Sequence, residues 1–455
     1  MPSPFAFGGN VPGSPDETSA VNGSPGLFPA VVLAMVTILA LKMGSVWFYS
    51  SRLIERPWPF SSFLFQPQDR FTDYLIPYNV AGYHNIYNPV YWKAGGLIPP
   101  PYGFAQYAML RYLPFRSSLV VTYGSYLVVL VAFVVLLWVL YMRCYSYDRP
   151  NRALYFIVFL VACYPLGFEV DRGNLDLFGA AIVAGLYCLT QRWGVTNWAT
   201  AVLFALLVSL KPSFALLALP LVLCIPWYWV LAAGAVVAFN YAVPILFYGA
   251  KVGYLVKLVK SASTVTNGVS LFTHNLGSGL LAVGVHTGVA FDVAIGACLL
   301  ACAIWVRYLI RGLDRRRVFT TVLTLAVLVT MIANYPSNDY QLIFLLPAFM
   351  MLPYLFPNVL GSVNGRRALG ISLVLVFAYT NVYIPGVFDY YTVLRALAPV
   401  VVFGLFTWEA WMTRAAATLF RSERSGEVPL VAGHTWPHAG QIQPPARSSS
   451  PSVPQ

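Results

Sequence analysis

The chain has 455 residues, of which 58% are hydrophobic and only 10% are charged, and its mean hydropathy is +0.68. Soluble globular domains contain about 25% charged residues, so this composition excludes a soluble enzyme and indicates a protein with many membrane spans. The net charge of +12 arises mostly in the connections between apolar segments, where membrane topology places Lys and Arg. We therefore expect no nucleic-acid partner.

The N-terminal residues 1–26 are rich in Gly, Pro and Ser and lack the basic and small-residue segments of a signal peptide. They are expected to form a disordered cytoplasmic tail. The first apolar segment, near residues 27–49, is then retained as a membrane span. Lys42 lies within this span, and the sequence assigns it no role.

Further spans follow from the length that a bilayer requires, which is roughly 20 apolar residues for a hydrocarbon core of about 30 Å. We expect them near residues 117–141, 153–168, 175–190, 197–210, 212–225, 228–248, 289–306, 318–334, 340–357, 368–384 and 391–413. The fold class is therefore an all-α bundle of about twelve transmembrane helices over residues 27–413. One broken or tilted helix is the alternative around Lys211-Pro212, because Pro ends a helix there. Residues 414–455 are expected to form a second disordered cytoplasmic tail.

The orientation of the bundle follows from the arginines in alternate short connections. These are Arg143, Arg149, Arg152, Arg192, Arg307, Arg311, Arg315, Arg316, Arg317, Arg366, Arg367, Arg414, Arg421 and Arg424. The opposite connections carry fewer cations, so both termini are expected in the cytoplasm. Two long loops, residues 50–116 and 249–288, then lie on the other side, and both are long enough to have their own structure.

The first outer loop carries a candidate general base, Asp73, with Asp69 as its rival. A carboxylate at the outer end of a helical bundle can take the proton of an attacking hydroxyl. Aromatic side chains nearby would suit a sugar, and those we expect to bind substrate are Tyr74, Tyr78 and Tyr102. The alternative is an interfacial acid paired with Arg70 or Arg52.

A second polar cluster joins two apolar segments at residues 169–176. Arg172 can hold a phosphate there, with Glu169 or Asp171 orienting it and Asn174 contacting substrate. Gly173 permits a close approach of the backbone. The alternative is an ion cluster that compensates itself and caps the two helices.

Three further polar positions fall on the same expected side. Lys211 interrupts an apolar stretch, and it either meets an anion or extends its ammonium to the membrane surface. His274 can donate to a phosphate or hydroxyl, beside Asn275, although a histidine in a loop is more often simply polar. The last position, Asn338-Asp339, is either a substrate contact or ordinary turn chemistry.

These motifs resemble those of the C-fold membrane glycosyltransferases, and most closely the polyprenol-phosphate-mannose-dependent mannosyltransferases of glycosyltransferase family 87. The resemblance covers roughly residues 60–350 and rests on Thr72-Asp73-Tyr74, Tyr87, Pro99-Pro100-Pro101-Tyr102, Asp171-Arg172-Gly173-Asn174-Leu175-Asp176, Lys211-Pro212, and Asn338-Asp339-Tyr340-Gln341-Leu342 before Leu345-Leu346-Pro347.

The resemblance implies a bacterial inner membrane enzyme that transfers a sugar, with mannose expected, from polyprenyl phosphate to a lipid or glycan hydroxyl on the non-cytoplasmic face. Asp73 is implied as the base of an inverting transfer. The leaving phosphate needs cationic donors, for which we expect Arg172, Lys211 and His274. Lys257 and Lys260 are expected to guide the lipid phosphate at the interface.

The chain departs from the family pattern in carrying Asn174 where a Gln is common, which leaves the donor sugar open. No Asp-x-Asp pair occurs in the first outer loop, so neither a metal nor another cofactor is expected. A transporter or flippase of a lipid-linked sugar is the main alternative, although no internal repeat is evident. A membrane scaffold is a third reading, but it gives no reason for the polar clusters to share one side.

Overall fold

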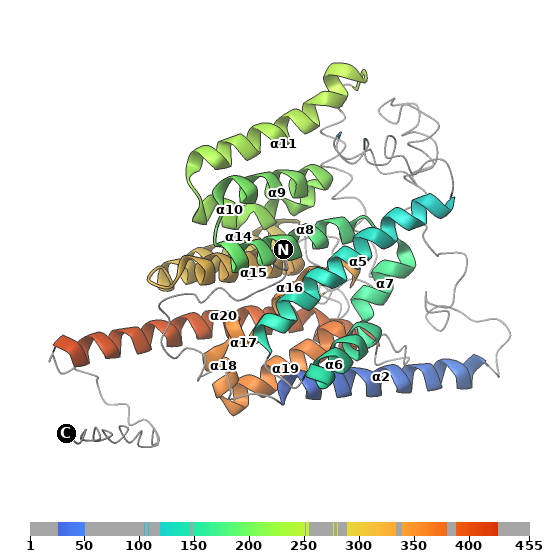
Figure 1. The fold of residues 1–455 in the computed structure, drawn as a ribbon, viewed down its shortest axis with the longest axis vertical. Helices are drawn as coiled ribbons and strands as arrows, with labels where there is room; N and C mark the ends of the chain where they lie inside the picture. Colours follow the sequence, from blue (N-terminus) through green and yellow to red (C-terminus); the bar gives the residue numbers. More distant parts are fainter. Residues whose placement is uncertain are drawn as a thin grey trace, which may run out of the picture. The chain divides into compact units, whose positions relative to one another are not determined.

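The computed structural model describes residues 26–50, 104, 108, 119–145, 149–250, 252–253, 276, 280, 289–333, 339–379 and 388–425. Helices are the regular secondary structure throughout these ranges (Figure 1). The prediction of an all-α fold is thereby confirmed for the part described. Most of the two expected outer loops, with Asp73 and His274 in them, lies outside these ranges.

The first half of the chain forms long helices with two short segments after residue 211. They are α2 (Leu27–Ser50), α5 (Leu119–Cys144), α6 (Arg149–Ala162), α7 (Tyr164–Arg172), α8 (Asp176–Trp193), α9 (Asn197–Leu210), the 3-10 helix η4 (Pro212–Ala218), α10 (Leu219–Cys224) and α11 (Trp227–Phe247). Lys211 ends α9 in an extended conformation, with φ −152° and ψ 123°. The chain is therefore broken at Lys211-Pro212, which was one of the two expected arrangements.

The second half contains four helices of at least 15 residues, with short helices between the second and the third of them. They are α14 (Val289–Leu309), α15 (Arg315–Ala333), the 3-10 helix η5 (Asp339–Leu345), α16 (Leu346–Phe349), α17 (Leu352–Leu355), α18 (Pro357–Gly361), α19 (Val363–Phe377) and α20 (Phe388–Ser425). The span expected near residues 340–357 is thus divided into several short segments. Pro347, Pro353 and Pro357 each lie in the first turn of one of them, because proline lacks the N–H that helix continuation requires.

Five helices in the described part of the chain are long and apolar enough to cross a membrane. They run over Leu27–Gly44, Gly124–Cys144, Trp227–Phe247, Arg315–Ala333 and Val393–Ala415. A sixth span results if the bent pair Asn151–Ala162 and Tyr164–Asp171 is counted as one. The described helices therefore support a multi-pass membrane protein, with fewer full-length spans than the sequence predicts.

The bend between α6 and α7 measures 57° and falls within the single span expected at residues 153–168. Pro165 lies in the first turn of α7 and cannot supply a backbone N–H to the preceding helix. The break turns α7 out of the direction of α6. As a result, the acidic end of α7 faces helices α5 and α8 inside the bundle.

Helix α15 forms the centre of the bundle, with 83% of its span buried inside the protein. It packs against α14, α10 and η4, and also against α8 and η5. The hydroxyls of Tyr187 and Thr324 share a hydrogen bond of 2.6 Å between α8 and α15. Around this centre, α5 packs on α8, α9 packs on α11, and α2 lies beside both α6 and α19 (Figure 1).

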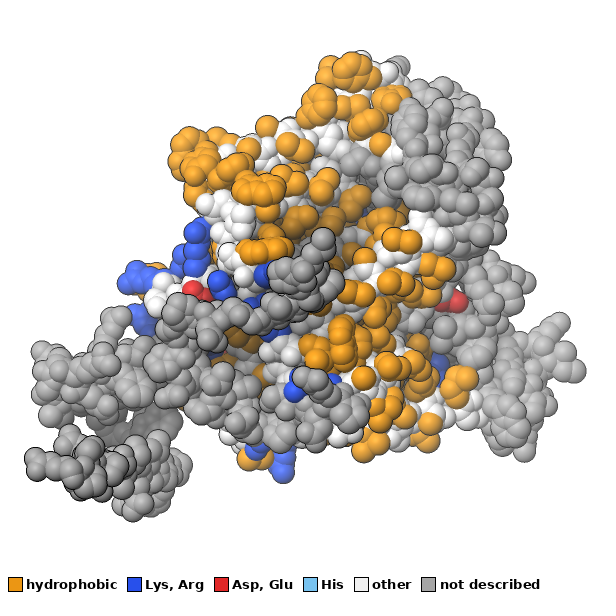
Figure 2. All heavy atoms as spheres, viewed as in Figure 1, with side chains coloured by type: hydrophobic (Ala, Val, Ile, Leu, Met, Phe, Trp, Pro, Cys, Tyr) orange, Lys and Arg blue, Asp and Glu red, His pale blue; other side chains and the backbone are white. Residues whose placement is uncertain are grey.

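Apolar side chains cover much of the visible surface of the described helices (Figure 2). Large exposed residues such as Leu231, Phe239 and Val293 lie along helices that a bilayer would surround. Lys and Arg side chains gather near the connection between α14 and α15 in the same view, where Arg311 and Arg315 are exposed. This separation of apolar flanks and a basic end is the pattern that a membrane imposes.

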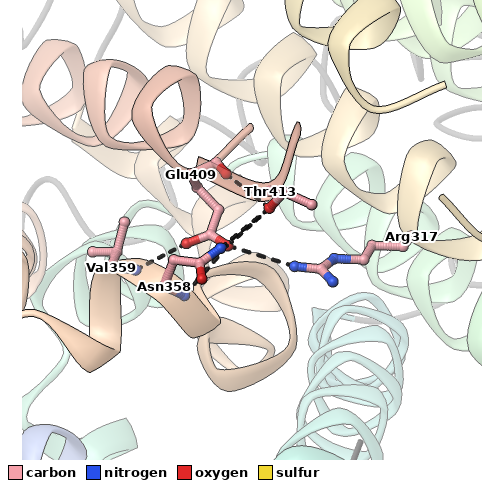
Figure 3. A network of polar contacts seen from close by, with 5 residues as sticks. All are labelled: Arg317, Asn358, Val359, Glu409 and Thr413. Atoms are coloured by element: carbon pink, nitrogen blue, oxygen red, sulfur yellow. Dashed lines mark hydrogen bonds and ion pairs between the residues drawn. The ribbon is translucent and has the colours of Figure 1, made fainter. Parts of the chain in front are cut away.

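A buried acid that the sequence analysis overlooked, Glu409, holds three helices together at this basic end (Figure 3). One oxygen of its carboxylate lies 3.5 Å from Arg317 of α15 and accepts a hydrogen bond of 2.8 Å from the side chain of Asn358. The other accepts the Val359 N–H at 2.9 Å. The carboxylate of α20 thereby ties the start of α18 to α15.

Helix α20 continues to Ser425, beyond the expected end of the last span at residue 413. The chain divides into two compact units at this point, Met1–Thr413 and Arg414–Gln455. The second unit therefore begins with a helical segment.

Candidate functional site

The polar segment 169–176 forms a sharp corner between α7 and α8. Gly173 ends α7 with φ 64°, a left-handed conformation that glycine adopts without strain. Its N–H donates to the carbonyl of Glu169 at 2.8 Å, which closes the last turn of α7. Gly173 was expected to permit a close approach of the backbone. In the structure, the left-handed turn at the end of α7 accounts for the glycine.

Glu169 is fully buried in this corner. Its Oε1 accepts the backbone N–H of Leu177 at 2.9 Å, so the carboxylate joins the end of α7 to the start of α8. The hydroxyl of Tyr126, from α5, donates to the carbonyl of Glu169 at 2.9 Å and lies 3.4 Å from Oε1. These contacts give Glu169 a structural role at the meeting point of three helices.

The start of α8 carries a second carboxylate, Asp176, which is 1% exposed. Asn174 fixes the local turn, because its Oδ1 accepts the N–H of Asp176 at 3.0 Å. A carboxylate in the first turn of a helix also interacts favourably with the helix dipole. Because it is buried, this carboxylate is expected to pair with a cation.

That cation is Lys211, whose Nζ lies 3.1 Å from each oxygen of Asp176. The ammonium also lies 5.6 Å from the ring centroid of Phe214, in the range of a cation–π interaction. The break of α9 at Lys211 brings this side chain to α8. Lys211 is thus held within the bundle by an anion, the carboxylate of Asp176, which is one of the two situations expected from the sequence.

Close packing keeps η4 and η5 against α8 beside this ion pair. Phe214 of η4 and Phe344 of η5 contact each other edge to face, with ring centroids 5.0 Å apart. Both rings lie over Gly179, where an added Cβ would come within 2.9 Å of Phe214 and 3.0 Å of Phe344. The absence of a side chain at Gly179 therefore lets both short helices approach α8.

Asp171 is also buried, but it lies on a different side of α7 from Glu169. Asp171 follows Tyr164 and Phe168 at helical spacing, on the face of α7 against which the Tyr379 ring lies. The two acids that the sequence offered as alternatives for orienting Arg172 therefore lie on different faces of α7.

The structure brings together three of the expected site residues, namely Glu169, Asn174 and Lys211, and it places Asp171 on another face of α7. For Arg172 and Asp339 it gives only the backbone, at the end of α7 and the start of η5, and α7 packs against η5. The other expected site residues lie outside the described ranges: Asp69, Asp73, Tyr74, Tyr78, Tyr102, Lys257, Lys260, His274, Asn275 and Asn338. Their roles stay predictions.

Three residues of the corner were not given roles from the sequence. Asp176 belongs to the motif at residues 171–176. Its position three residues after Gly173 was the signal that it begins α8. Tyr126 and Gly179 lie inside apolar helices, and nothing in the sequence marked them. In the described ranges no group of three His, Cys, Asp or Glu side chains is arranged to hold a metal ion.

Chemically, the corner is a rigid set of buried carboxylates and one ammonium at the end of two membrane helices. It can orient a charged group that approaches the ends of α7 and η4, because its own side chains are fixed by hydrogen bonds. No described side chain in it is poised as a nucleophile. The corner is therefore suited to binding and positioning.

Comparison with known proteins gives one match. The model of glycosyltransferase family 87 matches residues 98–333, which is more than half of the 455 residues. The matched range contains the whole corner and Lys211, whereas Asp73 precedes it. No curated protein and no solved structure matches the chain.

Proposed function

The chain belongs to glycosyltransferase family 87, and from that membership we propose that it transfers a sugar from a polyprenyl phosphate to a hydroxyl of a lipid or glycan. The membership itself makes the protein a membrane glycosyltransferase, in agreement with its apolar helices. We further propose mannose as the sugar and the non-cytoplasmic face of a bacterial inner membrane as the place of transfer. Both termini are then cytoplasmic, and about twelve spans of a C-fold bundle surround the site.

The observation that carries the proposal is the family match over a segment whose polar residues are buried among membrane helices. Glu169, Asp176 and Lys211 all lie in the matched range and at one corner of the bundle. Ionisable groups are costly within the membrane and usually serve a substrate path or one another. A lipid-linked donor explains why a transferase would keep such a corner in the bilayer.

In the proposed reaction Asp73 takes the proton of the acceptor hydroxyl as that oxygen attacks the anomeric carbon of the sugar. The new carbon–oxygen bond forms on the face opposite to the breaking bond, so the configuration inverts. The bond from the anomeric carbon to the phosphate oxygen breaks, and polyprenyl phosphate leaves with the bonding electrons. Asp69 is the rival base in the same loop.

The leaving phosphate gains negative charge, so fixed cations near it stabilise the transition state. Arg172 follows Asp171 at the corner, and we assign it the first contact with the phosphate. Lys211 borders the same corner, where Asp176 holds its ammonium in place. His274, Lys257 and Lys260 complete the proposed path of the lipid phosphate, with neither a metal nor another cofactor.

The proposal is tested by sugar transfer from labelled polyprenyl-phosphate-mannose in membranes that contain the parent protein, Asp73→Asn or Asp69→Asn at matched expression. Loss of a general base lowers the rate by about 10²–10⁴-fold. We expect such a loss for Asp73→Asn and near-parental transfer for Asp69→Asn. The opposite pattern would assign the base to Asp69, and equal transfer by all three proteins would exclude both acids as the base.

A further inference from the structure

A second buried cluster of aromatic and charged side chains surrounds the rings of Tyr164 and Tyr379. The two rings meet edge to face with centroids 5.3 Å apart, and the ring of Phe168 stacks on Tyr164 at 5.6 Å. Gly167 has no side chain, and an added Cβ would collide with the Tyr379 hydroxyl. The ring of Tyr379 is therefore seated directly against α7.

Two cations from distant parts of the chain lie over this ring pair. Lys42 of α2 places its Nζ 5.9 Å from the centroid of Tyr379, and Arg395 of α20 places its Cζ 5.0 Å from the centroid of Tyr164. Lys42 is 7% exposed and Arg395 is 3% exposed. Both lie inside helices that are candidate membrane spans. The first and last described helices, α2 and α20, thus each contribute one cation to this cluster.

The acidic side chain of this cluster is Asp171. It follows Tyr164 and Phe168 at helical spacing on one face of α7. Glu169 lies on another face, toward α5 and α8. Among the described side chains, the cluster therefore carries two positive charges and one negative charge. Helix α7 separates it from the Glu169 and Lys211 corner.

The composition of the cluster suits a phosphate more than it suits simple packing. Aromatic rings alone can support a cation, but two cations within membrane spans are costly, and such residues usually mark a functional path. An Arg guanidinium offers paired donors that match phosphate oxygens, and a Lys ammonium adds a point charge. The rings of Tyr164 and Tyr379 add flat faces and hydroxyls beside these cations.

We propose that Lys42 and Arg395 form a binding site for the phosphate of a lipid headgroup, on the face of α7 that carries Tyr164 and Asp171. The source of this phosphate is either the polyprenyl phosphate of the proposed reaction or a membrane phospholipid. The site itself does not depend on the proposed function, but its assignment to the donor does.

The test uses the full-length protein, purified and reconstituted, as the parent and as Lys42→Gln and Arg395→Gln. Binding is measured by native mass spectrometry and by the ligand-dependent shift of the thermal midpoint, with a short-chain polyprenyl phosphate, phosphatidylglycerol, phosphatidylcholine or inorganic phosphate as probe. Arg192→Gln is the matched control, because Arg192 lies over Trp193 at the same 5.0 Å but is exposed.

We expect each glutamine variant to weaken binding of the preferred phosphate lipid by about tenfold or more, since each removes a charge-assisted contact. Arg192→Gln should bind as the parent does. Preference for polyprenyl phosphate over phosphatidylglycerol would assign the site to the donor, and the reverse preference to a phospholipid. Both results support a phosphate site.

The charge-keeping variants Lys42→Arg and Arg395→Lys guard against a failure to fold. They should bind within a few-fold of the parent even where a glutamine variant is unstable. Parental binding by well-folded glutamine variants would overturn the proposal, as would the absence of saturable phosphate-lipid binding by the parent. Sugar transfer is scored separately, so that a parent that binds but transfers nothing contradicts only the proposed function.

Discussion

The contact between Lys211 and Asp176 predicts a specific pattern of stability in a double-mutant cycle. Asp176 has a side chain only 2% exposed, whereas that of Lys211 is 21% exposed. Lys211→Gln leaves a buried carboxylate without its cation, and breaking a buried pair in this way costs about 3 kcal/mol. Asp176→Asn costs less, about 1.5 kcal/mol, because the longer lysine side chain can turn toward water.

The combined variant Lys211→Gln with Asp176→Asn has no charge to bury and keeps two polar groups of similar size. We expect it to cost about 2 kcal/mol, which gives a coupling of roughly 2–3 kcal/mol, in the range found for contacting residues. Thermal unfolding in one detergent measures the cycle, at roughly 2 °C per kcal/mol for a large domain. Lys211→Gln should therefore lower the midpoint by about 6 °C.

The same cycle separates stability from transfer. If Lys211 also contacts the donor phosphate, the double variant should regain stability while its transfer remains low. Additive losses of stability, with the double variant worse than either single variant, would contradict a direct pair. Recovery of full transfer by the double variant would remove Lys211 from the phosphate site.

Packing around the corner and the basic end gives three further predictions. Gly179→Ala should lower the thermal midpoint and the transfer rate, because the added Cβ meets two rings within about 3 Å. Gly185→Ala on the same helix has nothing within 4 Å of its Cβ and should be neutral or slightly stabilising. Equal effects of the two variants would contradict the packing argument. Glu409→Gln should lower the free energy of unfolding by about 2 kcal/mol, because it weakens the contacts to α15 and α18. Asp314→Asn, at an exposed residue, should leave the thermal midpoint unchanged. Tyr126→Phe should cost about 1 kcal/mol through its lost hydrogen bond to Glu169, and an unchanged midpoint would show that this bond contributes nothing.

Composition and motifs were sufficient to predict the family and the membrane character of the chain, because both depend on local features. Apolar length indicated helices at α2, α5, α11, α15 and α20. The motif at residues 171–176 was correctly placed between two helices, with Gly173 in its turn. A match of the family model to residues 98–333 confirms the resemblance that these motifs suggested.

The contacts within the site depended on tertiary structure and could not be derived from spacing. Lys211 and Asp176 are far apart in the chain, and they meet only because α9 breaks at Lys211 beside the start of α8. Lys42 had no role in the sequence, yet it lies over a tyrosine that follows α19. Glu409 was overlooked within an apolar span, although an acid in such a helix indicates a partner, which is Arg317.

The short helices between residues 339 and 361 show a second limit of hydropathy. The run of apolar residues in this segment is long enough to suggest one span. Leu346 and Phe349 within it are buried in the core. Three prolines divide the run into short helices, which pack against α15 and α8. Apolar length therefore predicts burial here, but not a straight crossing of the membrane.

The central claim is that a lipid-linked sugar is the donor, and it is tested most directly with the purified protein in liposomes. Labelled mannose is supplied either as polyprenyl-phosphate-mannose or as a nucleotide sugar, with lipid extracts as acceptor. The account predicts labelled product from the polyprenyl donor alone, and its loss with Asp73→Asn. Transfer from the nucleotide sugar, or movement of the lipid donor across the bilayer with no product formed, would contradict it.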